Sequence, residues 1–125
     1  MTAKTKRIIP IVLMLIPALV LIMGGIAKII GAEPQTVMEF LTKEGFGNHI
    51  ILLGITELVI AGLFIYPKTN KIGFLLAISY FSGALSLELS AAAPPASAIF
   101  LVFLWVAMFV KSAEMFIPLT TPKDI

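Results

Sequence analysis

Four long apolar stretches, separated by short polar segments, make up most of the chain. They cover residues 8–30, 50–66, 72–93 and 96–110. A helix rises 1.5 Å per residue and a bilayer core is about 30 Å thick, so about 20 apolar residues are enough for one crossing. The pattern therefore predicts four membrane-spanning helices, of which the second, with about 17 residues, is near the lower limit for a span.

The segments between these stretches contain residues that end helices. Gly31 follows the first stretch, a polar turn at 67–71 follows the second, and two prolines at 94–95 end the third, because proline breaks the backbone hydrogen-bond ladder. Residues 33–41 have an early proline and apolar residues at 37, 38, 40 and 41, which predicts a short amphipathic helix at the membrane interface. Short connections favour antiparallel packing. We therefore expect an all-α, integral membrane four-helix bundle with a short interfacial helix in the first loop, in a single domain of residues 1–125.

Composition supports this fold class and excludes several functions. Hydrophobic residues make up 59% of the chain and charged residues 13%, about half of the roughly 25% found in soluble domains. The chain has no cysteine, which excludes disulfides, thiol redox chemistry and cysteine metal sites. The single histidine, His49, cannot form a metal site alone, and a net charge of +2 is too small to indicate nucleic-acid binding. No haem, flavin or iron–sulfur motif is present, so we predict no cofactor.

The basic residues indicate how the chain is oriented in the membrane. Lysine and arginine are concentrated at the N-terminus, in the second loop and in the tail, whereas the first loop has Lys43 against three glutamates. Cytoplasmic loops carry the excess of lysine and arginine, so we expect both termini in the cytoplasm, at a bacterial inner membrane. The first apolar stretch is longer than the core of a signal peptide, so we expect an uncleaved first helix.

Lys28, Glu57 and Glu88 are ionisable residues within or at the ends of the apolar stretches. A charge at the bilayer centre costs about 3 kcal/mol or more, so each needs a partner, a water-filled cavity or a nearby interface. Lys28 shares a helix face with Leu21 and Gly24, and small residues on a face indicate close contact with another helix. The alternative for Lys28 is snorkelling, in which the ammonium group reaches the lipid headgroups.

The two glutamates differ in how deeply the sequence places them. Glu57 lies about 10 Å below the start of its helix, by the rise per residue, and shares a face with Gly54 and Ala61, so we expect an interior carboxyl group that is partnered or protonated. Glu88 is either an interfacial carboxylate near a frayed helix end or a neighbour of an ion pair between Lys28 and Glu57.

Trp105 and Tyr80 complete the candidate ligand-binding or ion-pair residues. Both lie in the middle of predicted spans, whereas tryptophan and tyrosine usually prefer the membrane interface. Each is either an ordinary packing residue or a flat wall for an apolar ligand. We assign no catalytic residue.

Short motifs in a fixed order resemble the DoxX-like family of small four-helix membrane proteins. They lie at 25–28 (G-x-x-K), 54–57 (G-x-x-E), 67–69 (P-x-T), 73–76, 82–85 and 104–105 (L-W). The resemblance covers roughly residues 10–117 and implies the four-helix fold and a Lys28–Glu57 pair. Relatives often have a histidine where this chain has Glu88, so the resemblance does not carry a histidine-dependent role to this chain.

Two classes of function follow from these residues and from the resemblance. The wider DoxX group includes proteins linked to quinone-coupled sulfur oxidation and to membrane redox complexes, and a distant branch resembles chaperones of receptor assembly. We expect an accessory subunit or chaperone-like partner of a membrane complex, in contact with membrane lipids and with a membrane protein partner or further copies of itself. The alternative is a quinone- or lipid-binding component that uses Lys28 and the two glutamates. The sequence does not decide whether the protein is an enzyme.

Overall fold

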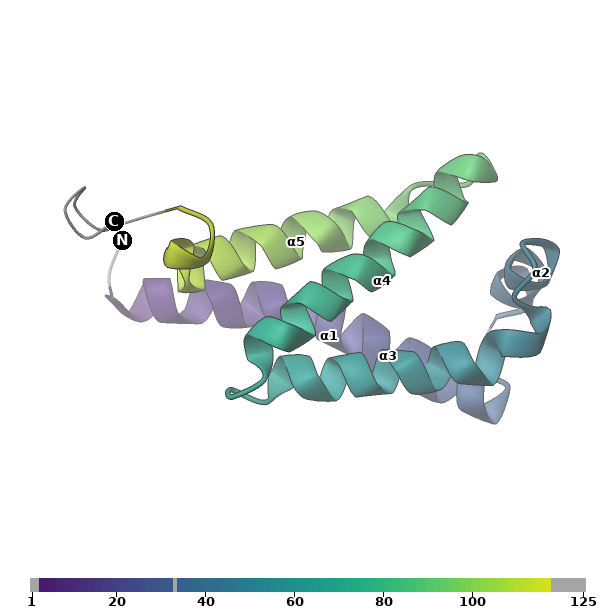
Figure 1. Ribbon diagram of the computed structural model, residues 1–125, viewed down its shortest axis with the longest axis horizontal. Coiled ribbons are helices and arrows are strands. Elements are labelled where there is room, and N and C mark those ends of the chain that lie inside the picture. The colour runs from purple at the N-terminus through teal and green to yellow at the C-terminus, as the bar shows by residue number, and fades with distance from the viewer. Residues whose placement is uncertain (1–2, 33, 118–125) are drawn as a thin grey trace.

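The computed structural model describes residues 3–32 and 34–117, and these residues form an all-α structure (Figure 1). Five α-helices follow one another: α1 (Ala3–Ile30), α2 (Gln35–Lys43), α3 (Ile50–Ile65), α4 (Asn70–Ser90) and α5 (Ala96–Lys111). Two single-turn 3₁₀-helices, η1 (Gly47–His49) and η2 (Ala113–Met115), precede α3 and follow α5. The all-α class predicted from the sequence is confirmed.

Three segments are long and apolar enough to cross a membrane: Arg7–Ile30, Gly47–Ile65 and Asn70–Ser90. Only 22–33% of their most apolar windows is buried inside the protein, so most of their apolar side chains face outward. Such a surface is stable in hydrocarbon and not in water. The prediction of a multi-pass integral membrane protein is therefore confirmed.

The fourth predicted span corresponds to α5, which is shorter than the other three. It has 16 residues, or about 24 Å at 1.5 Å per residue, against a bilayer core of about 30 Å. The crossing of the membrane by α5 therefore stays a prediction, whereas the other three helices have the length of a span. The second predicted span, by contrast, is long enough to cross the membrane. The 3₁₀-helix η1 continues directly into α3 and extends the apolar segment to 19 residues.

The four long helices form a ring in which α1 and α4 each pack against both α3 and α5. Figure 1 shows that α1 starts at the end of the molecule where α5 finishes, and that α2 lies at the opposite end. The core between them is made of apolar side chains from all four helices, with Leu21, Phe64, Phe74, Leu104 and Met108 almost fully buried.

The turn between α3 and α4 is fixed by side chains that bond the last carbonyl groups of α3. The Thr69 hydroxyl donates to the Leu63 carbonyl oxygen at 2.7 Å, and the Asn70 amide donates to the Phe64 carbonyl oxygen at 2.6 Å. These carbonyl groups have no partner within their own helix, so the two bonds supply one. As a result α4 starts at Asn70, whereas the apolar pattern placed its start at residue 72.

The other end of α4 closes in a Schellman motif, in which a left-handed residue lets the chain turn back onto the last helical turn. Ala92 has φ of 56°, and the Ala93 and Ala92 amides donate to the carbonyl oxygens of Glu88 at 2.8 Å and Leu89 at 3.2 Å. These are the two bonds that define the motif. The helix therefore ends at Ser90, before the position predicted from the two prolines.

The predicted amphipathic segment forms α2, a nine-residue helix with no buried residue. Its sequence position, Gln35–Lys43, is slightly later than the predicted 33–41. Gln35 and Glu39, one turn apart, are joined by a hydrogen bond of 3.1 Å. Among the five α-helices, α2 alone has polar and apolar residues in similar numbers, as expected for a helix at the membrane interface.

Substitution of Gly73 tests how closely α4 packs against α3. A Cβ at Gly73 would overlap the backbone nitrogen and Cα of Phe64, whereas a Cβ at Gly62 would meet no atom within 4 Å. Because backbone atoms cannot move aside cheaply, we expect Gly73→Ala to lower the free energy of unfolding by about 1–3 kcal/mol or more. The matched change Gly62→Ala should be neutral or stabilising by up to about 1 kcal/mol, since alanine favours helix. Unfolding in mixed detergent micelles, followed by circular dichroism, measures both, and equal effects would contradict the close α3–α4 contact.

Candidate functional site

Lys28 and Glu57 form a buried ion pair between α1 and α3. The Lys28 Nζ lies 3.0 Å from Glu57 Oε1, and only 9% of Lys28 and 5% of Glu57 is exposed. Lys28 therefore points into the protein, on the face that also carries the buried Leu21 and Gly25. Of the two orientations that the sequence left open, the structure has the protein-facing one and not snorkelling.

Glycines allow α1 and α3 to approach closely enough for this pair to form. A Cβ at Gly25 would lie 2.8 Å from the Gly54 carbonyl oxygen, and a Cβ at Gly54 would lie 2.8 Å from the Gly25 carbonyl oxygen. The two backbones are thus in direct contact, as in other membrane helix pairs with small residues at the crossing. One turn further along each helix, Lys28 and Glu57 meet across the same contact.

Tyr80 extends the ion pair to α4. Its hydroxyl group donates a hydrogen bond to Glu57 Oε1, the oxygen that also accepts from Lys28. The Lys28 ammonium group of α1 and the Tyr80 hydroxyl group of α4 therefore donate to the same carboxylate oxygen of α3. Partnering of this kind offsets part of the large desolvation cost of each buried ion. The structure thus brings together three of the five candidate residues.

Glu88, the fourth candidate, lies at a different helix contact. Its Oε2 accepts from the Ser97 backbone N–H at 3.1 Å, and its Oε1 accepts from the Ser97 hydroxyl at 2.7 Å. Ser97 is in the first turn of α5, where backbone N–H groups lack helical partners and the helix dipole favours a negative charge. Glu88 therefore caps α5 from the neighbouring helix, and the three charges do not form one cluster.

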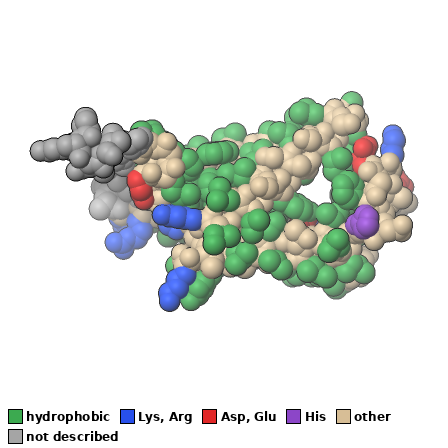
Figure 2. Space-filling view, in the orientation of Figure 1, with side chains coloured by type: hydrophobic (Ala, Val, Ile, Leu, Met, Phe, Trp, Pro, Cys, Tyr) green, Lys and Arg blue, Asp and Glu red, His purple; other side chains and the backbone are tan. Residues whose placement is uncertain are grey.

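A cavity of about 450 Å³ lies beside this network, at the end of the molecule that carries α2. We call it the α2-side cavity; Figure 2 shows the surface hollowed between α4 and that end. It exists because α4 starts in tight contact with α3 and then runs away from it toward the start of α5 (Figure 1). Aromatic and aliphatic side chains from the first loop and α3 form one side, and α4 forms the other. The lining residues are Phe40, Leu41, Phe46, Leu53, Ser79, Tyr80, Gly83, Ala84, Ser86, Leu87 and Glu88.

Trp105, the fifth candidate, does not line the α2-side cavity. Its ring packs edge-on against Phe74 with centroids 5.6 Å apart, and against Phe116 at 5.2 Å. Phe74 is near the start of α4, and so this aromatic cluster lies toward the opposite end from α2. The contacts favour the packing role of Trp105 over a ligand wall, whereas Tyr80 both packs and lines the cavity.

Sequence reasoning missed a second polar contact, between Asn70 and Lys111. Lys111 Nζ donates to Asn70 Oδ1 at 2.8 Å, and Asn70 is only 3% exposed. Both residues were assigned to polar segments outside the spans. The position of Asn70 after a Pro-Lys-Thr turn indicates a cap, but its partner is 41 residues away and no local pattern indicates it. Two serines of α4, Ser79 and Ser86, also line the α2-side cavity.

No protein-family model, curated protein or solved structure matches the chain. The resemblance to the DoxX-like family therefore has no support from these comparisons. Among the described residues, no group of three or more His, Asp or Glu side chains is placed to hold a metal ion. The chain is thus described by its architecture, as a small all-helical membrane protein with three long apolar helices.

Removal of one member of the ion pair tests its role in the fold. Lys28→Met leaves the Glu57 carboxylate buried without its counter-ion, which should lower the free energy of unfolding by about 3–5 kcal/mol. The double variant Lys28→Met/Glu57→Gln removes both charges but keeps an acceptor for Tyr80. It should recover most of the loss, because apolar replacements of a buried pair are often tolerated.

Detergent-titrated unfolding of the full chain measures these changes, with Lys43→Met, at an exposed lysine of α2, as the control for loss of a positive charge. A single variant no less stable than the control would contradict a structural role for the pair. A double variant as unstable as the single one would contradict charge compensation as its basis.

Proposed function

We propose that this protein binds a small amphiphilic molecule, of the quinol or lipid class, in the α2-side cavity. The observation that carries the proposal is the position of Tyr80. Its ring lines the cavity, while its hydroxyl group is tied to the buried Lys28–Glu57 pair. The cavity is therefore the place where a small molecule within the membrane would meet the polar centre of the protein.

The size and lining of the cavity support this class of ligand. Small-molecule sites usually measure about 300–1,000 Å³ and combine apolar walls with a few placed polar groups. Here the volume is about 450 Å³. Phe40, Phe46 and Leu53 supply flat and aliphatic surface, and Tyr80 and Glu88 supply polar atoms. A ring or short acyl segment with one polar end suits such a lining.

The hydrogen bonds that Tyr80 and Glu88 already make favour a ligand whose polar end donates a hydrogen bond to the wall of the α2-side cavity. The Tyr80 proton is already given to Glu57, so the phenolic oxygen is left as an acceptor. The Glu88 carboxylate accepts two bonds from Ser97, and an ionised carboxylate can only accept. A hydroxyl-bearing head, as in a quinol, complements these groups better than a carbonyl-bearing head, as in the matching quinone.

Binding without catalysis is the activity we assign to the chain alone. A quinol that is oxidised must pass its electrons to an acceptor, and the sequence has no haem, flavin or iron–sulfur motif that could take them. Any redox step would need a partner protein. This proposal agrees with the quinone-linked part of the DoxX-like resemblance, which remains a prediction from sequence motifs.

A role as accessory subunit is the second candidate, and the outer surface of α4 favours it. Ser82 and Gly83 are exposed, and a Cβ at Gly83 would meet no atom within 4 Å. Small residues on a lipid-facing surface allow the close approach of another helix. A partner seated there would cover the same side of α4 that lines the cavity, so the two candidates compete for one surface.

A bulky residue at Gly83 tests the cavity proposal. We expect the full chain in lipid nanodiscs to bind a short-chain ubiquinol saturably, and more tightly than the matching ubiquinone. Gly83→Leu puts a side chain into the cavity and should weaken binding at least about 10-fold, equivalent to about 1.4 kcal/mol. Gly62→Leu adds the same side chain at an open position that does not line the cavity, and should leave binding unchanged. Calorimetry under anaerobic conditions measures each affinity.

Three results of this experiment would count against ligand binding. No saturable quinol binding, or equal effects of the two leucine variants, would reject the α2-side cavity as a quinol site. A native mass spectrum in which the purified chain carries a second polypeptide, lost in Gly83→Leu but kept in Gly62→Leu, would favour the accessory-subunit role instead.

We further propose that α5 crosses the membrane with the other three helices and that both termini are cytoplasmic. Support comes from the packing of α5 against α1 and α4 along the ring and from the gathering of Lys and Arg side chains at the end where α1 begins (Figure 2). Positively charged residues are retained on the cytoplasmic side. The membrane would then thin locally or be bridged by flanking residues around this short helix.

Labelling of single cysteines tests this topology, and the natural absence of cysteine removes any background. Gly45→Cys, next to α2, should react with a membrane-impermeant maleimide in intact cells. Lys68→Cys and Glu114→Cys, at the opposite end, should react only after permeabilisation. Reaction of Glu114→Cys in intact cells, with Lys68→Cys protected, would show that α5 does not cross.

A further inference from the structure

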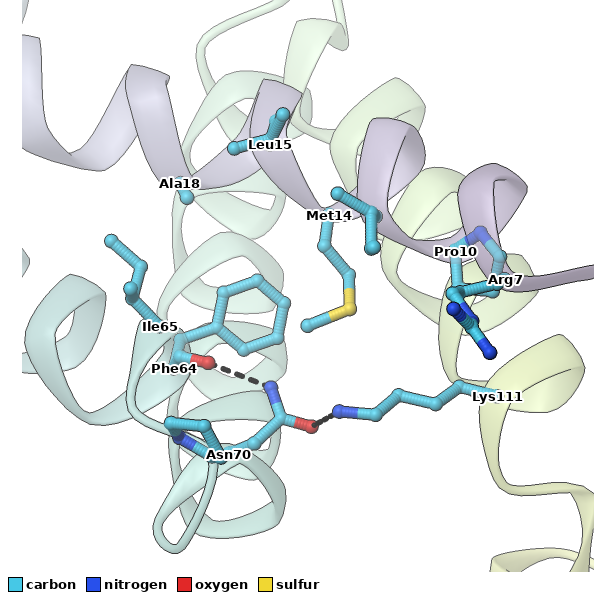
Figure 3. A pocket seen from close by; sticks show the side chains of 11 residues that line it. Arg7, Pro10, Met14, Leu15, Ala18, Phe64, Ile65, Asn70 and Lys111 are labelled. Carbon is cyan, nitrogen blue, oxygen red and sulfur yellow. Dashed lines mark hydrogen bonds between the residues drawn. The ribbon is translucent and has the colours of Figure 1, made fainter. Parts of the chain in front are cut away.

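A second cavity, of about 510 Å³, lies at the opposite end of the molecule from α2. We call it the basic-end cavity. Figure 3 shows that its lining comes from the first half of α1, from the α3–α4 turn and from the last residue of α5. It shares no lining residue with the α2-side cavity, so what it binds is independent of the function proposed above.

Among the described residues that line this cavity, the charged ones are two cations. Arg7 extends from α1 and Lys111 from α5, toward the same side of the cavity (Figure 3). Among the described residues, no carboxylate forms an ion pair with either of them. By contrast, the buried Lys28 is neutralised by Glu57 within the protein. Within the described part of the chain, the basic-end cavity is therefore lined by two cations that no carboxylate neutralises.

Lys111 is held in place by a buried polar residue. Its Nζ donates to Asn70 Oδ1 at 2.8 Å, and the Asn70 amide in turn donates to the Phe64 carbonyl oxygen at 2.6 Å. Asn70 is 3% exposed, so its orientation is fixed by the turn. An ammonium group has three donors, and this contact uses one of them. Lys111 is thus a positioned cation, with donors left for a ligand.

The floor beneath the two cations is apolar. Met14 and Ala18 on α1 point toward Phe64 on α3 (Figure 3), and Leu15 and Ile65 also line the cavity. Leu15 and Ile65 are about half exposed, so this floor is continuous with the surface that α1 and α3 present to lipid. A ligand here would hold an anion at the cations and a hydrocarbon chain along the floor.

From this combination we infer that the basic-end cavity binds one membrane phospholipid with an anionic headgroup. Arginine binds phosphate through paired N–H groups and lysine binds it as a point charge. Basic sites between membrane helices select acidic lipids, and each lysine or arginine near an anionic membrane surface adds to that attraction. The acyl chain would lie along Met14 and Leu15, with its phosphate between Arg7 and Lys111.

Native mass spectrometry of the full chain, released from detergent with added lipid, tests this inference. Phosphatidylglycerol and phosphatidylcholine with identical acyl chains serve as the probes. We expect phosphatidylglycerol to bind at least on the order of 10-fold more tightly, because two cations favour the anionic head. Arg7→Gln/Lys111→Gln should reduce this preference to within about 3-fold, and Lys111→Arg should retain it.

The matched control is Lys68→Gln/Lys71→Gln, which removes two exposed lysines from the same end of the molecule without touching the cavity lining. This variant should keep the full preference. An equal loss in both double variants would overturn the site in favour of a diffuse basic surface. Displacement of phosphatidylglycerol by millimolar inorganic phosphate would show a phosphate site and not a lipid site.

The unfolding midpoint of each variant shows whether a loss of lipid binding comes from a loss of stability. Arg7→Gln alone leaves the Lys111–Asn70 bond intact, so it should lower the preference for phosphatidylglycerol without a change in the unfolding midpoint. If the double variant unfolds in detergent, the single variant carries the test. Retention of the full preference in a folded Arg7→Gln would overturn the proposed role of Arg7.

Discussion

The fold is organised around the crossing of α1 and α3, where two glycines bring the helices into backbone contact and Lys28 meets Glu57. In a membrane, helices gain nothing from excluding water from one another, so their association relies on close packing and on polar contacts. This crossing has both. Gly25 and Gly54 set the distance between the helices, and the ion pair sets their register, since a shift of one residue would turn Lys28 or Glu57 toward lipid. Tyr80 then ties α4 to the same oxygen atom.

The path of α4 follows from two fixed points and leaves a space between them. At its start Gly73 lies against the backbone of Phe64, and at its end Glu88 holds the first turn of α5. A straight helix that satisfies both contacts must leave α3 on the way. The α2-side cavity is the result, and it is walled by the serines and glycine of α4 where a fully packed bundle would have larger side chains. The small polar residues of α4 thus leave room for the cavity, because larger side chains at these positions would fill it.

The faces of the helices were predictable from sequence, and the partners of their polar residues were only partly so. Periodicity placed Lys28 with Leu21 and Glu57 with Gly54, and these faces are buried as expected. The pair between Lys28 and Glu57 was expected because both residues lie on helix faces with small residues and because the DoxX-like resemblance implies it. Glu88 was uncertain because its partners are the hydroxyl and amide groups of Ser97, and neither carries a charge that a sequence reveals. The Asn70–Lys111 contact was invisible, since it depends on how the α3–α4 turn meets the end of α5. The length of α5 and the left-handed Ala92 likewise depend on how the chain turns between α4 and α5.

The two ends of the molecule differ in whether a carboxylate of the same chain neutralises their cations. Lys28 is neutralised by Glu57 of the same chain, so its role is complete within the protein. The α2-side cavity is also lined by Glu88, whose carboxylate accepts hydrogen bonds from Ser97. Arg7 and Lys111 have no such partner among the described residues, although Asn70 holds Lys111 in a fixed position. Fixing a side chain costs conformational entropy, and a cation that only needed water would not require a buried amide to orient it. A charge that is positioned but not neutralised is suited to a partner outside the chain, and at the end of an apolar groove in a membrane that partner is an acidic lipid.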